Sequence, residues 1–71
     1  MTKYIRTVSG DPIGILRQAG TRINATNMSG KLLGWYLPTT DATFNADGIM
    51  IAFGDITPYL ICKDAKLKIR K

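Results

Sequence analysis

A glycine-centred octet that recurs three times constrains the fold more than any other feature of this sequence. The copies are SGDPIGIL at 9–16, SGKLLGWY at 29–36 and DGIMIAFG at 47–54. When they are aligned on the first glycine, a large aliphatic residue, a small residue and a large apolar residue follow at fixed offsets. A repeat of this period is typical of a supersecondary unit whose neighbours stack to bury a common core.

Each copy is predicted to be a β-hairpin. Ser-Gly and Asp-Gly are turn dipeptides, because glycine accepts the positive φ that tight turns require. The stretches before them are rich in threonine and in β-branched or aromatic residues, as strands are. Apolar residues show no three-and-four spacing that would indicate a long helix. An all-β chain is therefore expected, with hairpin units at about 4–16, 21–37 and 41–54.

The second strand of each unit has a small residue in its middle: Gly14, Gly34 or Ala52. Glycine inside a strand marks a bulge, a bend or the close approach of another backbone. Because the small residue recurs at one level, a small meander that forms a roll or barrel is expected.

The C-terminal stretch YLICKDAKLKIRK, residues 59–71, is expected to be a degenerate fourth unit. Its last seven residues, AKLKIRK, alternate apolar and basic side chains as a half-buried strand does. A disordered basic tail over 63–71 is the alternative that remains open.

Positive charge is concentrated at the same end. The net charge is +5, and residues 63–71 carry five Lys/Arg against one Asp, or +4. A basic end of this kind indicates an anionic partner such as nucleic acid, a nucleotide or an acidic protein surface. A solubilising role is the alternative. The residues assigned to this basic surface are Lys63, Lys66, Lys68 and Arg70.

A chain of 71 residues is expected to form one domain, 1–71, with a marginal core. One cysteine, Cys62, and no histidine leave neither an internal disulfide nor a Cys/His zinc site to support that core. Self-association into a homo-oligomer is therefore expected. The apolar runs are too short for a membrane helix or a signal peptide, which predicts no membrane partner and a cytoplasmic location in a bacterial or infected host cell.

Binding is favoured over catalysis. Without histidine, Cys62 has no evident base beside it, and the aspartates adjoin Gly, Pro or Ala in predicted turns. No enzyme activity, metal or cofactor is expected. Aromatic stacking combined with basic side chains is the usual means of holding nucleotides or single strands. The candidate ligand-binding residues are Arg17, Arg22, Lys31, Tyr36 and Tyr59.

Trp35 and Phe53 occupy the repeated large-apolar position that Ile15 fills in the first copy. These two aromatic residues are therefore expected in the core.

The repeat resembles that of the four-fold beta flower proteins, small bacterial proteins with successive G-x-x-[IV]-G-x hairpin units. The resemblance covers roughly residues 4–54, with Ala52 replacing the second glycine of the third unit and no proper fourth glycine unit. It implies a β fold and no established chemistry, so no catalytic residue is carried over. The matching residues are Gly10, Ile13 and Gly14; Gly30, Leu33, Gly34 and Trp35; and Gly48, Ile51 and Ala52.

The sequence thus predicts a non-enzymatic binding module for an anionic ligand. A nucleotide-type small molecule held between the subunits of a homo-oligomer is the first interpretation. By analogy with small phage accessory proteins, the ligand would be a host defence signal or component. Two alternatives stay open: nucleic-acid binding through the basic C-terminal strand, and a structural or protein-interaction module.

Overall fold

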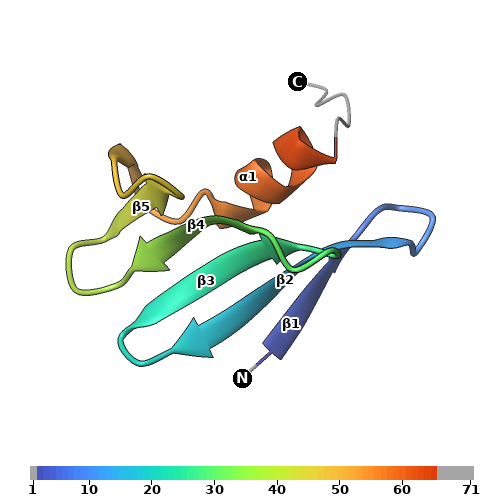
Figure 1. Cartoon of the computed structure of the whole chain (residues 1–71), viewed down its shortest axis with the longest axis horizontal. Helices are drawn as coiled ribbons and strands as arrows, with labels where there is room; N and C mark the ends of the chain where they lie inside the picture. The colour runs from blue at the N-terminus through green and yellow to red at the C-terminus, as the bar shows by residue number, and fades with distance from the viewer. Residues whose placement is uncertain (1, 66–71) are drawn as a thin grey trace.

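The computed structural model describes residues 2–65, which form one antiparallel six-stranded sheet and a helix (Figure 1). Each strand pairs with the next along the chain, in the order β1-β2-β3-β4-β5-β6. The elements are β1 (Thr2–Arg6), β2 (Pro12–Ala19), β3 (Arg22–Asn27), β4 (Leu32–Leu37), β5 (Ala42–Asn45), β6 (Met50–Phe53) and α1 (Thr57–Asp64). The expected hairpin meander is confirmed, but the expected closure into a barrel is wrong.

The sheet stays open because its first and last strands lie at opposite edges. β1 (blue) and the β5–β6 hairpin (yellow to gold) are separated by the whole width of the sheet in Figure 1. Within residues 2–65, each of these two strands therefore pairs on one side only.

The three hairpins share one turn. Gly10, Gly30 and Gly48 adopt φ of +94°, +90° and +83°, as the turn dipeptides predict. The residue three places earlier accepts a hydrogen bond from the glycine N–H and closes the loop, and it is Thr7, Asn27 or Asn45. The side chains of Asn27 and Asn45 also accept backbone N–H bonds inside the turn, at 2.9–3.0 Å.

A β-bulge also recurs in every hairpin. The register shifts between Ile5 and Arg6 in the first hairpin, and at the equivalent points in the other two. The aliphatic residue of the repeat is the extra residue on the second strand, and it is Ile13, Leu33 or Ile51. Bulges increase the local twist of a sheet, so the repeat sets the same bend three times.

The helix α1 replaces the strand expected at the start of unit 59–71, and that part of the prediction is wrong. Pro58 lies in the first turn, where its fixed φ favours a helix and its missing N–H costs nothing. Asp55 Oδ1 accepts hydrogen bonds from the backbone N–H and the hydroxyl of Thr57, at 3.0 and 2.6 Å. The expected AKLKIRK strand, with Lys66, Lys68 and Arg70, falls almost entirely outside the described residues.

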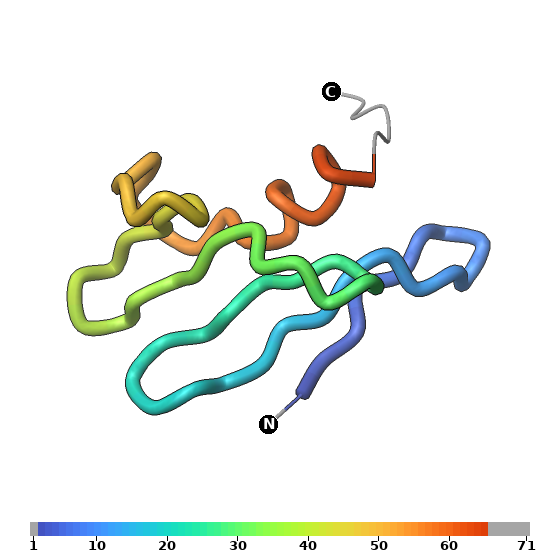
Figure 2. Tube along the Cα trace, in the orientation of Figure 1, coloured from blue at the N-terminus to red at the C-terminus, as the bar shows by residue number. Residues whose placement is uncertain are grey.

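The helix packs on one face of the sheet, over β2, β3 and β4 (Figure 2). Ile61 is fully buried there, in a cluster with Leu16 and Ala25. A Cβ added to Gly14 would lie 2.7 Å from Ile61 Cδ1, and one added to Gly34 would lie 2.7 Å from Leu60 Cδ1. Gly14 and Gly34 therefore leave the space in which the helix sits, and Gly34 also allows the close approach of the Phe44 carbonyl of the adjacent strand.

Gly14→Ala is expected to lower the free energy of unfolding by about 1–3 kcal/mol, because the new methyl overlaps Ile61. Chemical denaturation measures the loss. The double variant Gly14→Ala/Ile61→Ala should lose less than the sum of its two single variants, since the smaller side chain makes room.

The matched control is Ala52→Gly, which alters the same repeat position on β6, outside the strands under α1. It should cost only the ordinary penalty for glycine in a strand, roughly 0.5–1 kcal/mol. Simple additivity at Gly14 and Ile61 would contradict the packing account.

Candidate functional site

The face of the sheet away from α1 is here called the open face. Gly14 and Gly34 lie under the helix and so identify which strand residues belong to each face. Side chains alternate between faces along a regular strand, so Ile15 and Trp35, which follow Gly14 and Gly34, point away from α1. The strand registers then align one continuous row of open-face residues across all six strands. In strand order the row is Thr2, Arg17, Asn24, Trp35, Phe44 and Met50.

Aromatic rings and arginines are interleaved on this face. The rings of Trp35 and Phe44 stack with centroids 5.8 Å apart and planes 15° from parallel. The Arg22 guanidinium carbon lies 4.3 Å from the centroid of Trp35. A second pair, Arg6 and Tyr4, repeats the arrangement on β1 at 5.7 Å. Such cation–π contacts hold a guanidinium over a ring. Arg6 Nη1 also donates a 3.2 Å hydrogen bond to the Gly10 carbonyl.

The charge of the sheet is of one sign. Its strands contain four cationic residues, and all five aspartates of the chain lie outside them, in turns or in α1. Lys3 pairs with Leu16 of the buried cluster, so it belongs to the helix side. The remaining three, Arg6, Arg17 and Arg22, are on the open face, which is consequently electropositive.

Trp35 and Phe53 were expected in the core, and the structure places them elsewhere. Trp35 is half-buried on the open face, and Phe53 is 75% exposed on β6. The repeat sets the direction of these side chains, but burial also needs a neighbouring strand or layer. Among residues 2–65, Phe53 lacks such a neighbour because β6 is an edge strand.

Asn24 stands in the middle of the row, between Arg17 and Trp35. Within residues 2–65, its Oδ1 is the one buried side-chain polar atom without a hydrogen-bond partner. An unsatisfied buried acceptor costs stability, so the centre of the open face is not optimised for stability alone.

The structure brings together only two of the five predicted ligand-binding residues. Arg17 and Arg22 lie on the open face, on the paired strands β2 and β3. Lys31 is in the β3–β4 turn, and Tyr59 is half-exposed on α1. Tyr36 lies on the helix side, where its hydroxyl donates a 2.7 Å hydrogen bond to Asp41 Oδ1.

Tyr4, Arg6 and Phe44 lie on the same face as the two arginines and were not predicted from the sequence as part of this site. The available signal was alternation, because residues out of phase with the repeated small position share a face.

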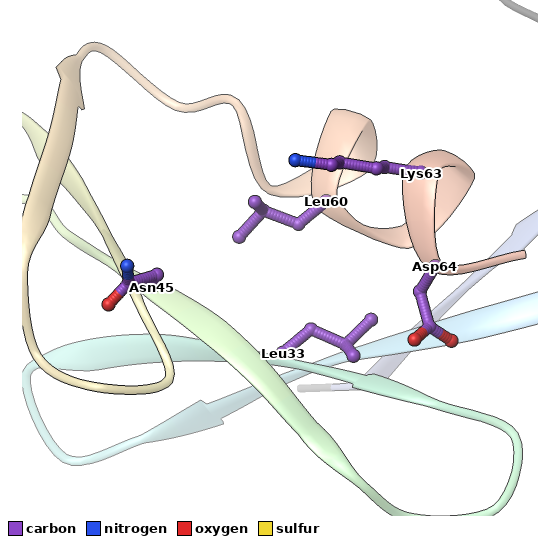
Figure 3. Close-up of a pocket in the computed structure, with 5 residues that line it drawn as sticks. All are labelled: Leu33, Asn45, Leu60, Lys63 and Asp64. Carbon is purple, nitrogen blue, oxygen red and sulfur yellow. The ribbon is translucent and has the colours of Figure 1, made fainter. Parts of the chain in front are cut away.

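A groove on the opposite side of the sheet contains the predicted basic residue Lys63 (Figure 3). Its volume is ≈ 410 Å³, and its lining residues are Leu33, Asn45, Leu60, Lys63 and Asp64. Leu33 and Leu60 face each other across it (Figure 3). Asp64 accepts a 3.2 Å hydrogen bond from Asn27 and brings a carboxylate to the rim. The groove is therefore less suited to an anion than the open face.

The described residues hold no group of three or more metal-ligating side chains, and none of their helices is long and apolar enough to span a membrane. Comparisons with protein families, curated proteins and solved structures gave no match.

Tyr36 is expected to ionise above its ordinary pKa of 10.0, because its hydroxyl donates to Asp41 and the nearby carboxylate disfavours the phenolate. The raised pKa means that this hydrogen bond stabilises the fold fully below pH 10 and is lost as the pH rises through the folded-state pKa. Tyrosinate absorbance measures the titration in a Tyr4→Phe/Tyr59→Phe background.

Asp41→Asn should lower the pKa of Tyr36, since it removes the charge while asparagine tolerates the positive φ of 52° at this position. Asp47→Asn, in the β5–β6 turn, is the control and should leave the titration in place. Equal shifts from both variants would contradict the assignment to Asp41.

Proposed function

We propose that the open face binds single-stranded nucleic acid. The observation that carries the proposal is the Arg22–Trp35–Phe44 stack on a strand surface with three arginines and no carboxylate. Bases stack on aromatic side chains or on guanidinium planes, while arginines meet the phosphates between them. The arginine edges and the exposed ring of Tyr4, 48% accessible, supply both kinds of contact.

The length of the row favours a strand over a single nucleotide. Six strands are separated by five spacings of about 4.8 Å, so the row is about 24 Å long. That length accommodates several nucleotides, in the range of site sizes known for small β-folds that bind single strands. A mononucleotide, the ligand expected from the sequence, would occupy one stack and leave the remaining arginines without phosphates.

Binding of a fluorescent oligothymidine, followed by anisotropy at several salt concentrations, tests the proposal. The affinity should fall with salt, with a log–log slope of about −0.7 for each phosphate contact. Arg17→Gln and Arg22→Gln should weaken binding and flatten the slope. Trp35→Leu should cost about 1–3 kcal/mol of binding free energy with little change in slope, because it removes stacking rather than charge.

Lys3→Gln is the matched control, since it removes one positive charge from the helix side of the same sheet. It should change affinity far less than Arg17→Gln does. Equal losses from both variants would reduce the binding to attraction by net charge and overturn the open-face site.

Two further experiments distinguish open-face binding of a strand from binding at the C-terminal segment and from binding of a single nucleotide. A variant with Lys66, Lys68 and Arg70 changed to Gln tests the C-terminal basic segment, and loss of binding in that variant alone would move the site there. Competition by a mononucleotide at equal phosphate concentration tests the single-nucleotide alternative, and full displacement would favour that ligand over a strand.

A further inference from the structure

The pairing between successive hairpins follows one register. Where the first hairpin meets the second, Gly14 pairs with Asn27 and Ile15 pairs with Thr26. Where the second meets the third, the equivalent residues pair in the same way, Gly34 with Asn45 and Trp35 with Phe44. The repeat therefore specifies the register in which the second strand of one hairpin pairs with the first strand of the next hairpin.

Both kinds of strand are also present at the edges of the sheet. Within residues 2–65, β6 is the second strand of its hairpin and has no following hairpin beside it. β1 is the first strand of its hairpin and has no preceding hairpin beside it. We propose that β6 of one molecule pairs with β1 of a second copy, in the register of the two internal junctions. Applied to the edges, this register pairs Ala52 with Thr7 of the second copy and Phe53 with Arg6 of the second copy.

The exposure of β6 supports a missing neighbour. Phe53 is 75% exposed, whereas Trp35, its equivalent in the repeat, is half-buried beside Phe44 of the next hairpin. Ile49, Met50 and Ile51 are exposed as well, at 59%, 45% and 41%. A hydrophobic edge strand with no lysine or proline in it is the kind that accepts another strand.

The charges near the two edge strands favour one of the three possible edge pairings between two copies. β1 contains Lys3 and Arg6 and no acidic residue, whereas β6 is uncharged and lies between Asp47 and Asp55. Pairing β1 with β1 brings cations together, and pairing β6 with β6 brings aspartates together. Pairing β6 with β1 brings opposite charges together and places the Arg6 guanidinium beside the Phe53 ring, which repeats the arginine–aromatic contact within the chain.

Two internal features limit the length of this ladder. Gly54, with φ of +82°, turns the chain away from the sheet, and its N–H donates to the Asp41 carbonyl. The strand pairing therefore ends at Phe53, and side-chain contacts contribute much of the affinity. Because different edges meet, the association is head-to-tail and gives a ring where the rotation closes.

Sedimentation of the full chain without nucleic acid tests for association and keeps this test independent of the proposed function. The wild-type protein should sediment as a concentration-dependent multiple of 7.8 kDa. Phe53→Arg should return it to 7.8 kDa, because it opposes Arg6 of the second copy. Adding Arg6→Glu to that variant should restore the larger species. Tyr59→Arg, the same change at a half-exposed aromatic residue on α1, is the control and should leave the mass unchanged.

Disulfide formation tests the register. Directly paired strand residues have Cα atoms about 4.5–5.5 Å apart, within the range that a disulfide spans. In a Cys62→Ser background, the double variant Thr7→Cys/Ala52→Cys should form intermolecular disulfides on oxidation, and neither single variant should do so to the same extent. A monomer at every concentration would overturn the proposal, as would equally efficient cross-linking of Ala52→Cys alone, which indicates β6 paired with β6.

Discussion

The contact of Ile61 and Leu60 with the two interior glycines organises the rest of this small structure. It allows an eight-residue helix to approach the sheet closely enough to bury Ile61 completely. A helix this short has little stability of its own, so its formation depends on that packing. The same contact decides which face of the sheet becomes the core. Apart from the bulged residues Ile13 and Leu33, strand residues out of phase with Gly14 and Gly34 are thereby directed to the opposite face.

A single sheet with one helix cannot cover both of its faces, and the open face accommodates this with amphipathic side chains. Arg22 lies along the ring of Trp35, and Arg6 lies along that of Tyr4. Long basic side chains of this kind shield apolar surface while their charged ends stay in water. Such a face is soluble in isolation, and it presents cations at a fixed height above aromatic rings. The arrangement that protects the apolar surface is thus also the arrangement that suits a phosphate-linked ligand.

The hairpins were predictable from the sequence because the signals are local. The turn glycines and the small residue in each second strand are read directly from a few neighbouring letters. The helix was missed because the apolar residues that face the sheet, Leu60 and Ile61, are adjacent and resemble a short strand, although Pro58 and Asp55 offered a start signal. The predicted burial of Phe53 was wrong for a different reason. Repeated position in a sequence implies repeated direction, whereas burial depends on what lies beside the strand in space.

No single sequence motif predicts the open face, because its composition depends on which face of the sheet the helix covers. Tyr4, Arg6 and Phe44 come from β1 and β5, and only the strand registers place them on the same face as Arg17 and Arg22. The local context of each aromatic or basic residue in the sequence does not reveal which face of the sheet it lies on. The distinction between Tyr36 and Trp35, neighbours in sequence on opposite faces, required the position of α1.

The edge pairing and the open face share side chains, which couples the two proposals physically. Phe53 pairs with Ala42, and the direction of that pair places it on the same face as Trp35 and Phe44. A second copy joined at β6 would place its Arg6 beside Phe53, so the two open faces would meet at an arginine–aromatic contact. A nucleic acid long enough to lie on two copies would raise the effective concentration of one edge at the other. By linkage, assembly would strengthen nucleic-acid binding by the same factor by which nucleic acid strengthens assembly. This reciprocity gives the short β6–β1 ladder a role even where its own affinity is low.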